Sequence, residues 1–119
     1  MNGSVVQLDS VYKGQAVTAH SAITATATST EINAKGYNAV LVSVLISGTG
    51  TWKIDVQGRM NTSGTVMDIY DNNDVQLTTG NLTASRMRLF VAVPDLIKIV
   101  ATEVSGTATC TVRVQPLNV

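Results

Sequence analysis

The chain has 119 residues, the size of a single domain, and its one cysteine, Cys110, excludes an internal disulfide. Eight basic residues balance eight acidic ones, so nothing indicates binding to nucleic acid or to an anionic membrane. No apolar run approaches the roughly 20 residues of a membrane-spanning helix. The first residues, Met1 to Ser4, also lack a basic start and are not followed by an apolar segment, so no secretory signal is expected.

Charged residues make up only 13% of the chain, whereas soluble domains carry about 25%. A chain that is poor in charge and rich in Val and Thr has strand edges and faces that pair readily with other chains. Burial in a partner interface protects such surfaces. We therefore expect a homo-oligomer or a subunit of a larger assembly. The alternative is a monomer with a threonine-rich polar surface.

Residues 1–14 are the hardest part of the chain to assign. Val5, Val6 and Leu8 favour a short strand, which Asp9 interrupts. We predict either an edge strand or an arm that reaches a neighbouring subunit, with a flexible tail as the alternative. The three apolar residues are candidate interface residues, and residues 15–119 are predicted to form the domain itself.

Threonines alternate with small apolar residues between positions 15 and 30. This pattern predicts a strand from Ile23 to Ser29 with its threonines outward, because alternating β-branched residues disfavour the competing helix. His20, just before this strand, is predicted to be a surface side chain. Residues 31–36 contain Asn and Gly and are predicted to form a turn.

The most regular alternation lies between residues 38 and 57, where two arms flank a glycine-rich turn. It predicts a β-hairpin whose arms pair with each other. The predicted inward-facing residues are Val40, Val42, Val44, Ile46, Trp52, Ile54 and Val56. The opposite face of the first arm is also apolar at Leu41 and Leu45. A strand that is apolar on both faces lies under a loop or contacts another subunit, so both leucines are candidate interface residues.

A later strand carries a second candidate contact surface. Arg86, Arg88 and Phe90 are spaced two apart, so they share one face of that strand. Arginine and aromatic residues are enriched in interfaces, and the three residues are therefore predicted to form a contact stripe. The alternative is an exposed sheet face with two solvated arginines.

A Ser-Gly-Thr turn occurs twice, at residues 47–49 and 105–107. An alternating strand follows it in both places, which predicts two similar hairpins with Trp52 and Cys110 at matching inward positions. Short strands separated by Gly and Asn turns at this spacing are typical of all-β domains. We predict a single-domain antiparallel β-sandwich of the jelly-roll type.

Candidate catalytic and metal-binding residues are few. His20 and Cys110 could form a nucleophilic pair, but Cys110 lies on an apolar strand face, where thiols are buried and unreactive. Asp68 and the Asp and Asn residues at 71–74 could bind calcium, but their spacing does not match an EF-hand loop. Solvated turn residues are the better interpretation. We therefore predict no catalytic site, no metal and no cofactor.

Two runs carry a family resemblance: VLISGTGTWKIDVQG (residues 44–58) and RLFVAVPDLIKIVATEVSGTATCTVRV (residues 88–114), with a loop-rich middle between them. This order of strands and turns resembles small β-sandwich virion proteins of tailed bacteriophages, in particular capsid decoration (cement) proteins and some tail-associated proteins. The resemblance implies a non-enzymatic structural protein that is made in the cytoplasm of a bacterial host and located on the capsid exterior.

The resemblance also implies the partners. These are further copies of the chain, in a homo-oligomer such as a trimer, and the major capsid protein, whose expanded shell the bound protein would stabilise by mass action. The alternative is a tail-associated module or a receptor- or carbohydrate-binding β-sandwich. Such a module needs an exposed aromatic platform, for which Trp52 is the main candidate. Its position in line with Ile54 and Val56 favours a core role instead.

Overall fold

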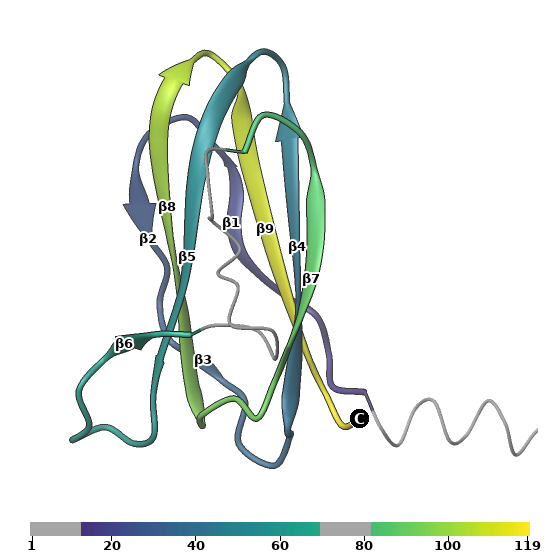
Figure 1. Ribbon diagram of the computed structural model, residues 1–119, viewed down its shortest axis with the longest axis vertical. Helices are drawn as coiled ribbons and strands as arrows, with labels where there is room; N and C mark the ends of the chain where they lie inside the picture. Colours follow the sequence, from purple (N-terminus) through teal and green to yellow (C-terminus); the bar gives the residue numbers. More distant parts are fainter. Residues whose placement is uncertain (1–12, 70–81) are drawn as a thin grey trace, which may run out of the picture.

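The computed structural model describes residues 13–69 and 82–119, which form antiparallel strands in two layers (Figure 1). The strands are β1 (Val17–Ile23), β2 (Ala27–Thr28), β3 (Ile32–Asn33), β4 (Ala39–Ser47), β5 (Gly50–Arg59), β6 (Met67–Asp68), β7 (Arg86–Val91), β8 (Leu96–Gly106) and β9 (Thr109–Leu117). No helix that could cross a membrane occurs in the part of the chain that the structure describes. The candidate interface residues Val5, Val6 and Leu8 lie outside it.

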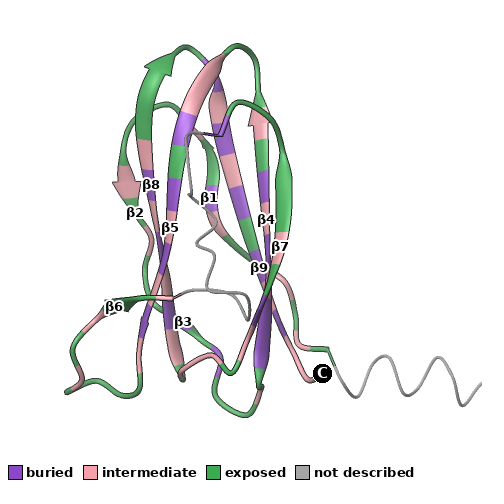
Figure 2. Cartoon of the chain, viewed as in Figure 1, coloured by how far each residue is buried: buried purple, intermediate pink, exposed green. Residues whose placement is uncertain are grey.

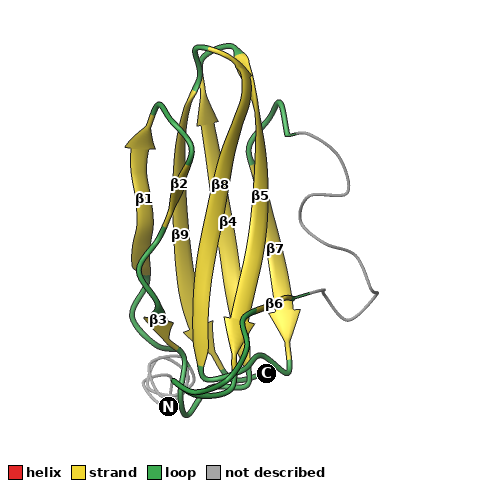
Figure 3. Cartoon of the chain, turned by 90° about the vertical axis from the view of Figure 1, so that its left-hand side faces the viewer, coloured by secondary structure: helices red, strands yellow, loops and turns green. Residues whose placement is uncertain are grey.

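The strands form two sheets that pack face to face (Figure 3). Sheet A has the order β1-β9-β4-β7, and sheet B has the order β2-β8-β5-β6. β3 also pairs with β8, beside β2, so β2 and β3 are two pieces of one edge position. This is the strand order of a jelly roll. The prediction of an all-β, single-domain antiparallel sandwich of the jelly-roll type is confirmed.

The predicted hairpin between residues 38 and 57 is wrong. β4 belongs to sheet A and pairs with β7 and β9, whereas β5 belongs to sheet B and pairs with β8 and β6. The turn at Gly48 therefore joins two different sheets and is a β-arch, and the turn at residues 105–107 does the same for β8 and β9. Hairpins and arches show the same alternation in sequence, so the pattern identified the inward residues without revealing the pairing.

The two β-arches lie together and close one end of the sandwich, here called the arch end (Figure 1). The carbonyl oxygen of Thr49 accepts hydrogen bonds from the backbone N–H groups of Thr107 (2.9 Å) and Ala108 (3.0 Å). Gly106 has a φ of +85°, and a Cβ atom at this position would lie 2.5 Å from Cα of Gly50. Position 106 therefore needs glycine, both for its backbone conformation and for the close approach of the arches.

The core lies between the sheets and alternates along the long strands with outward-facing residues (Figure 2). Trp52 is fully buried, and its indole N–H donates a hydrogen bond to the carbonyl oxygen of Ala108 at 3.1 Å. Cys110 is fully buried as well. The predicted inward positions of Trp52 and Cys110 are confirmed, and Trp52 does not form an exposed platform for stacking on sugars.

The predicted strand from Ile23 to Ser29 is also wrong. β1 ends at Ile23, and the chain then crosses to sheet B, where β2 begins at Ala27. Ala22, with a φ of +47°, lies where the crossing starts. The alternation of Ala and Thr continues through the crossing, so the pattern did not reveal the change of sheet. Residues 31–36 are not a turn throughout either, because β3 lies within them.

His20 is buried rather than at the surface, contrary to the prediction. It lies in β1, whose pairing with β9 has register shifts on both sides of His20. Nε2 of its imidazole donates a hydrogen bond to the carbonyl oxygen of Ile99 on β8, at 3.0 Å. A carbonyl oxygen can only accept, so Nε2 carries a proton. The side chain therefore connects β1, an edge strand of sheet A, to β8 in the interior of sheet B, which no alternation pattern signals.

Candidate functional site

The outer face of sheet A carries a row of apolar side chains on two neighbouring strands, β4 and β7. Leu41 pairs with Leu89 across these strands. Leu45 is 54% exposed, Met87 is 60% exposed and Leu89 is 38% exposed, while Leu41 is half-buried. We call these four residues the outer stripe. A contiguous apolar row on a sheet face marks a contact surface more clearly than single exposed residues do.

Polar residues of β9 border the outer stripe on the same face. β9 pairs with β4 on the side away from β7, and places Arg113 beside Ser43. A shallow hollow crosses this boundary and is lined by Ala16, Leu41, Ser43, Met87, Arg113 and Gln115. The face therefore has an apolar side on β4 and β7 and a polar side on β9, and protein–protein contacts likewise combine apolar and polar areas.

The predicted contact stripe of Arg86, Arg88 and Phe90 lies on the other side of β7. By register, these residues share a side with the buried valines of β4. Phe90 is fully buried in the core, so its prediction as an interface residue is wrong. The β7 sequence has apolar residues on both sides, and burying a phenylalanine removes more apolar surface from water than burying Leu89 would.

The two arginines lie on β7, which is an edge strand of sheet A. Arg86 is exposed and Arg88 is half-buried. Charged residues on the inward side of an edge strand hinder pairing with the edge of another sheet. Contact of Arg86 and Arg88 with another chain stays a prediction, as does contact of Leu41 and Leu45.

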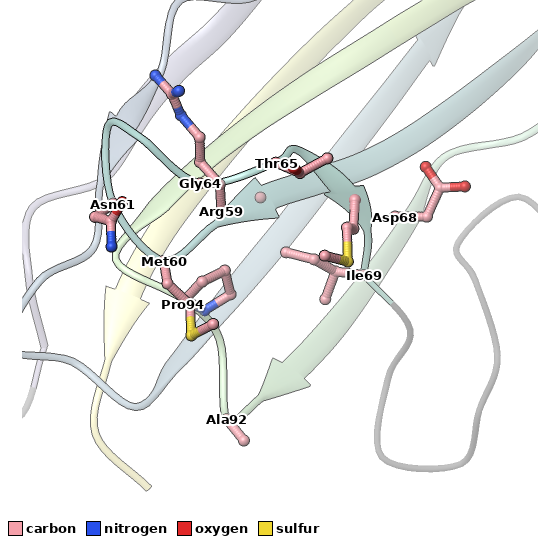
Figure 4. Close-up of a pocket in the computed structure, with 11 residues that line it drawn as sticks. Arg59, Met60, Asn61, Gly64, Thr65, Asp68, Ile69, Ala92 and Pro94 are labelled. Carbon is pink, nitrogen blue, oxygen red and sulfur yellow. The ribbon is translucent and has the colours of Figure 1, made fainter.

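A second surface lies at the end of the sandwich opposite the arches. It is a hollow of about 320 Å³, here called the loop-end pocket (Figure 4). Its walls come from the end of β5, the β5–β6 loop, β6 and the turn after β7. Its apolar lining consists of Met60, Met67, Ile69, Ala92 and Pro94. Met60 and Met67 are 76% and 64% exposed, so two flexible thioether side chains are available to a partner.

Hydrogen bonds fix the β5–β6 wall of the loop-end pocket. Arg59 donates from Nε (2.8 Å) and Nη2 (2.6 Å) to the carboxylate of Glu31, and from Nη1 to the carbonyl oxygen of Thr62 (2.8 Å). The hydrogen bonds from Arg59 lower the pKa of Glu31. The side chain of Asn61 accepts from the backbone N–H of Ser63 at 3.0 Å. The loop that presents Met60 is therefore held in place before any partner binds.

The opposite wall and the floor are equally constrained. Ala92 has a φ of +59°, a strained conformation for a residue other than glycine, and its N–H donates to the carbonyl oxygen of Asn38 at 2.6 Å. Gly58 forms part of the floor. A Cβ atom there would lie 2.7 Å from both the Leu96 carbonyl oxygen and Cγ of Pro94. The absence of a side chain at position 58 lets the pocket walls pack closely on β5.

The loop-end pocket has no pattern in the sequence that predicts it. Its residues come from two regions that are distant in sequence, 58–69 and 92–94, without a shared period, and only the fold brings them together. One signal was available, since Met60 and Met67 are large apolar residues in and beside a loop of Asn, Ser and Gly. Exposed methionines of this kind indicate adaptable contact surfaces.

The described catalytic and metal-binding candidates lie on three different strands, with His20 in β1, Asp68 in β6 and Cys110 in β9. Within residues 13–69 and 82–119, no group of three or more His, Cys, Asp or Glu side chains is placed to hold a metal ion. Asp68 accepts a hydrogen bond from Gln57 at 3.0 Å, while residues 71–74 of the candidate calcium cluster lie outside the described residues. Burial raises the pKa of the Cys110 thiol to about 11, which keeps it protonated and unreactive at neutral pH.

Comparison with models of protein families and with curated proteins finds no match. Among solved structures, the chain is similar to the crystal structure of the SPBc2 prophage-derived protein YomS, with a TM-score of 0.58 and 20% sequence identity over 85% of this chain and 91% of that chain. A weaker match, with a TM-score of 0.34 and 14% identity, covers 89% of this chain and 29% of a chain in the structure of infectious bursal disease virus Gx strain. The likeness to YomS shows that the two chains share a fold.

Proposed function

We propose that the protein is a non-enzymatic structural protein of a bacteriophage virion that binds the outer surface of the capsid as a decoration (cement) protein. It acts as a homo-oligomer, in the form of a trimer, and its second partner is the major capsid protein. In this proposal the outer stripe contacts the capsid. Neither nucleic acid nor a membrane is among the partners.

The outer stripe is the observation that carries the proposal. Leu45, Met87 and Leu89 expose large apolar side chains on one sheet face of a chain that has few charges to keep it soluble. The polar residues beside the outer stripe, such as Arg113, are typical of a contact between two proteins that are already folded. The fold shared with a prophage-derived protein supports a phage origin.

The mechanism would be mass action on the assembled shell. A protein that binds only the intact capsid stabilises it by about 2.7 kcal/mol per site when its free concentration is 100 times its Kd. Such a function needs a rigid body with a preformed contact face and no reactive groups. Sheet A provides such a face, because the alternate residues of β4 are fixed in the core.

The tail-associated and carbohydrate-binding alternatives have less support. A sugar-binding module stacks its ligand on exposed aromatic rings. Trp52 and Phe90 are fully buried, and Tyr37 is half-buried, so residues 13–69 and 82–119 offer no exposed aromatic platform. A tail location would use the same outer stripe with a different partner.

The test is cosedimentation of the purified protein with capsids of the phage or prophage that encodes it, after removal of any bound copies. We expect Leu45→Glu to weaken binding more than about tenfold, which corresponds to 1.4 kcal/mol. Val104→Glu is the matched control, because Val104 is 47% exposed on sheet B. Wild-type protein that does not sediment with capsids, or a Leu45→Glu variant that binds as well as Val104→Glu, would contradict the proposal.

A further inference from the structure

The loop-end pocket is a preformed apolar site that the outer stripe does not include. It is lined by residues of the β5–β6 region and of the turn after β7, at the opposite end from the arches. Its volume of about 320 Å³ lies at the small end of the range for ligand sites, about 300–1,000 Å³. A site of this size accepts one or two aliphatic side chains of a peptide segment. It is too small to bury a larger ligand.

The chain itself contains a segment of the right chemistry. Residues 1–12 include Val5, Val6, Leu8 and Val11, and Asp9 is their only charged side chain. An apolar segment with so little charge matches the apolar lining of the loop-end pocket.

The position from which this segment leaves the fold brings it to the same end of the molecule. Lys13 pairs with Leu117 at the end of β9, and the N–H of Gly14 donates to the carbonyl oxygen of Pro116 at 2.7 Å. Leu117 pairs with Ala39, and Ala39 pairs with Val91, which immediately precedes the pocket residue Ala92. The exit and the pocket are thus three strand spacings apart, about 14 Å. Twelve extended residues span up to about 40 Å, so the reach is sufficient.

The arrangement favours a pocket on another copy over the pocket of the same chain. The exit lies beside β1 and β9, at one edge of sheet A, and the pocket lies beyond β7, at the other edge. Between them, Asn38 holds the chain end, because its side chain accepts from the N–H of Val119 (2.9 Å) and its backbone N–H donates to the side chain of Asn118 (2.9 Å). A segment that crosses to its own pocket must pass this contact.

From this geometry we infer that residues 1–12 of one copy bind in the loop-end pocket of a second copy. Valine and leucine side chains of the segment contact Met60 and Met67 at the rim. Because donor and acceptor surfaces lie at opposite edges of the sheet, the contact is head-to-tail, and such a contact forms a closed ring when the rotation between copies closes. The inference rests on the homo-oligomer in the proposed function, and it is independent of capsid binding.

The experiment is a disulfide test with two chains in one cell. Chains that carry Leu8→Cys are coexpressed with chains that carry Met67→Cys, and the purified protein is mildly oxidised. Since each chain has only one introduced cysteine, a link between positions 8 and 67 can form only between copies. The native thiol does not compete, because Cys110 is fully buried and burial raises its pKa to about 11.

The matched control replaces Met67→Cys with Met87→Cys. Met87 is exposed to a similar degree, but it lies on the outer stripe. We expect the 8–67 link, identified by mass spectrometry, to exceed the 8–87 link by more than about tenfold, because a bound segment has a far higher effective concentration at its own site. Equal yields would overturn the inference.

A link that forms only when Leu8→Cys and Met67→Cys are placed in the same chain would also overturn it, since the segment would then occupy its own pocket. Failure of this inference can be distinguished from failure of the proposed function. An oligomer in light scattering that gives no 8–67 link contradicts only the inference. An 8–67 link in a protein that does not sediment with capsids contradicts only capsid binding.

Discussion

The two ends of the sandwich are built on opposite principles. At the arch end, backbone packs on backbone: the arches share the hydrogen bonds of the Thr49 carbonyl oxygen, and Gly106 leaves no space for a side chain. At the loop end, side-chain hydrogen bonds hold an open pocket whose rim carries exposed Met60 and Met67. The close backbone packing of the arches and the open pocket are therefore separated along the long axis, so mutations at the two ends should have different effects.

The largest effect should come from Gly106→Ala at the arch end. Alanine at position 106 would have to adopt a strained φ of +85°, and its methyl group would overlap the Gly50 backbone. We expect a loss of roughly 3 kcal/mol in the free energy of unfolding, measured by urea denaturation. Gly36→Ala is the control, because Gly36 has a φ of +91° but no atom within 4 Å of the added group. It should lose only about 1–2 kcal/mol, and equal losses would show that the arches are not closely packed.

Alkaline pH should also weaken the protein through Cys110, the second residue of β9 after the arch. Its pKa is raised from 9.0 to about 11, so between these values the unfolded chain loses the thiol proton and the folded chain keeps it. Stability is therefore fully present below pH 9.0 and falls by about 2–3 kcal/mol up to about pH 11. Urea denaturation across this range should show a smaller fall for Cys110→Ala. The same fall in both proteins would assign it to other groups.

At the loop end, Gly58→Ala should have an intermediate effect. The added methyl group would lie 2.8 Å from Cδ1 of Ile69 and closer still to Pro94, but the backbone at position 58 is not strained. We expect a loss of about 1–3 kcal/mol, with part of the overlap relieved by outward movement of the pocket walls. Thermal unfolding measures the loss, and a crystal structure of the variant would show the displaced walls. An unchanged melting temperature would mean that the floor is loosely packed.

The smallest effect on folding should come from the rim of the loop-end pocket. Met60→Gln and Met67→Gln remove exposed apolar side chains, so each should change the free energy of unfolding by less than about 0.5 kcal/mol. Met87→Gln on the outer stripe should be equally neutral. If either rim variant lost more than about 1 kcal/mol in the free energy of unfolding, the methionine would belong to the core.

Much of the fold could be predicted from the sequence, because one face of each long strand must be apolar. Alternation identified the inward positions of Val40, Trp52 and Cys110 and the outward positions of Leu41 and Leu45. It could not give the strand pairing, because an arch and a hairpin place the same residues inward. The pairing depends instead on ladders between distant segments, such as β4 with β9 and β5 with β8.

The candidate sites were less predictable, for three physical reasons. On β7 both sides are apolar, so only the register with β4 decided that Phe90 is buried and that Met87 and Leu89 are exposed. His20 lies in a strand with irregular register, where alternation gives no direction. The loop-end pocket combines residues such as Met60 and Pro94 that are distant in sequence and have no common period.

The position of β9 has a consequence for how the protein is made. This strand is the last in the described fold, yet it lies inside sheet A, paired with β1 on one side and β4 on the other. Until it leaves the ribosome, β1 has no neighbour in its sheet, and β4 lacks one of its two hydrogen-bonded neighbours. At about 5–20 residues per second, a 119-residue chain spends roughly 6–24 s in synthesis. For most of that time, charge-poor strands emerge without their partners, and we expect the nascent chain to be prone to aggregation until β9 pairs.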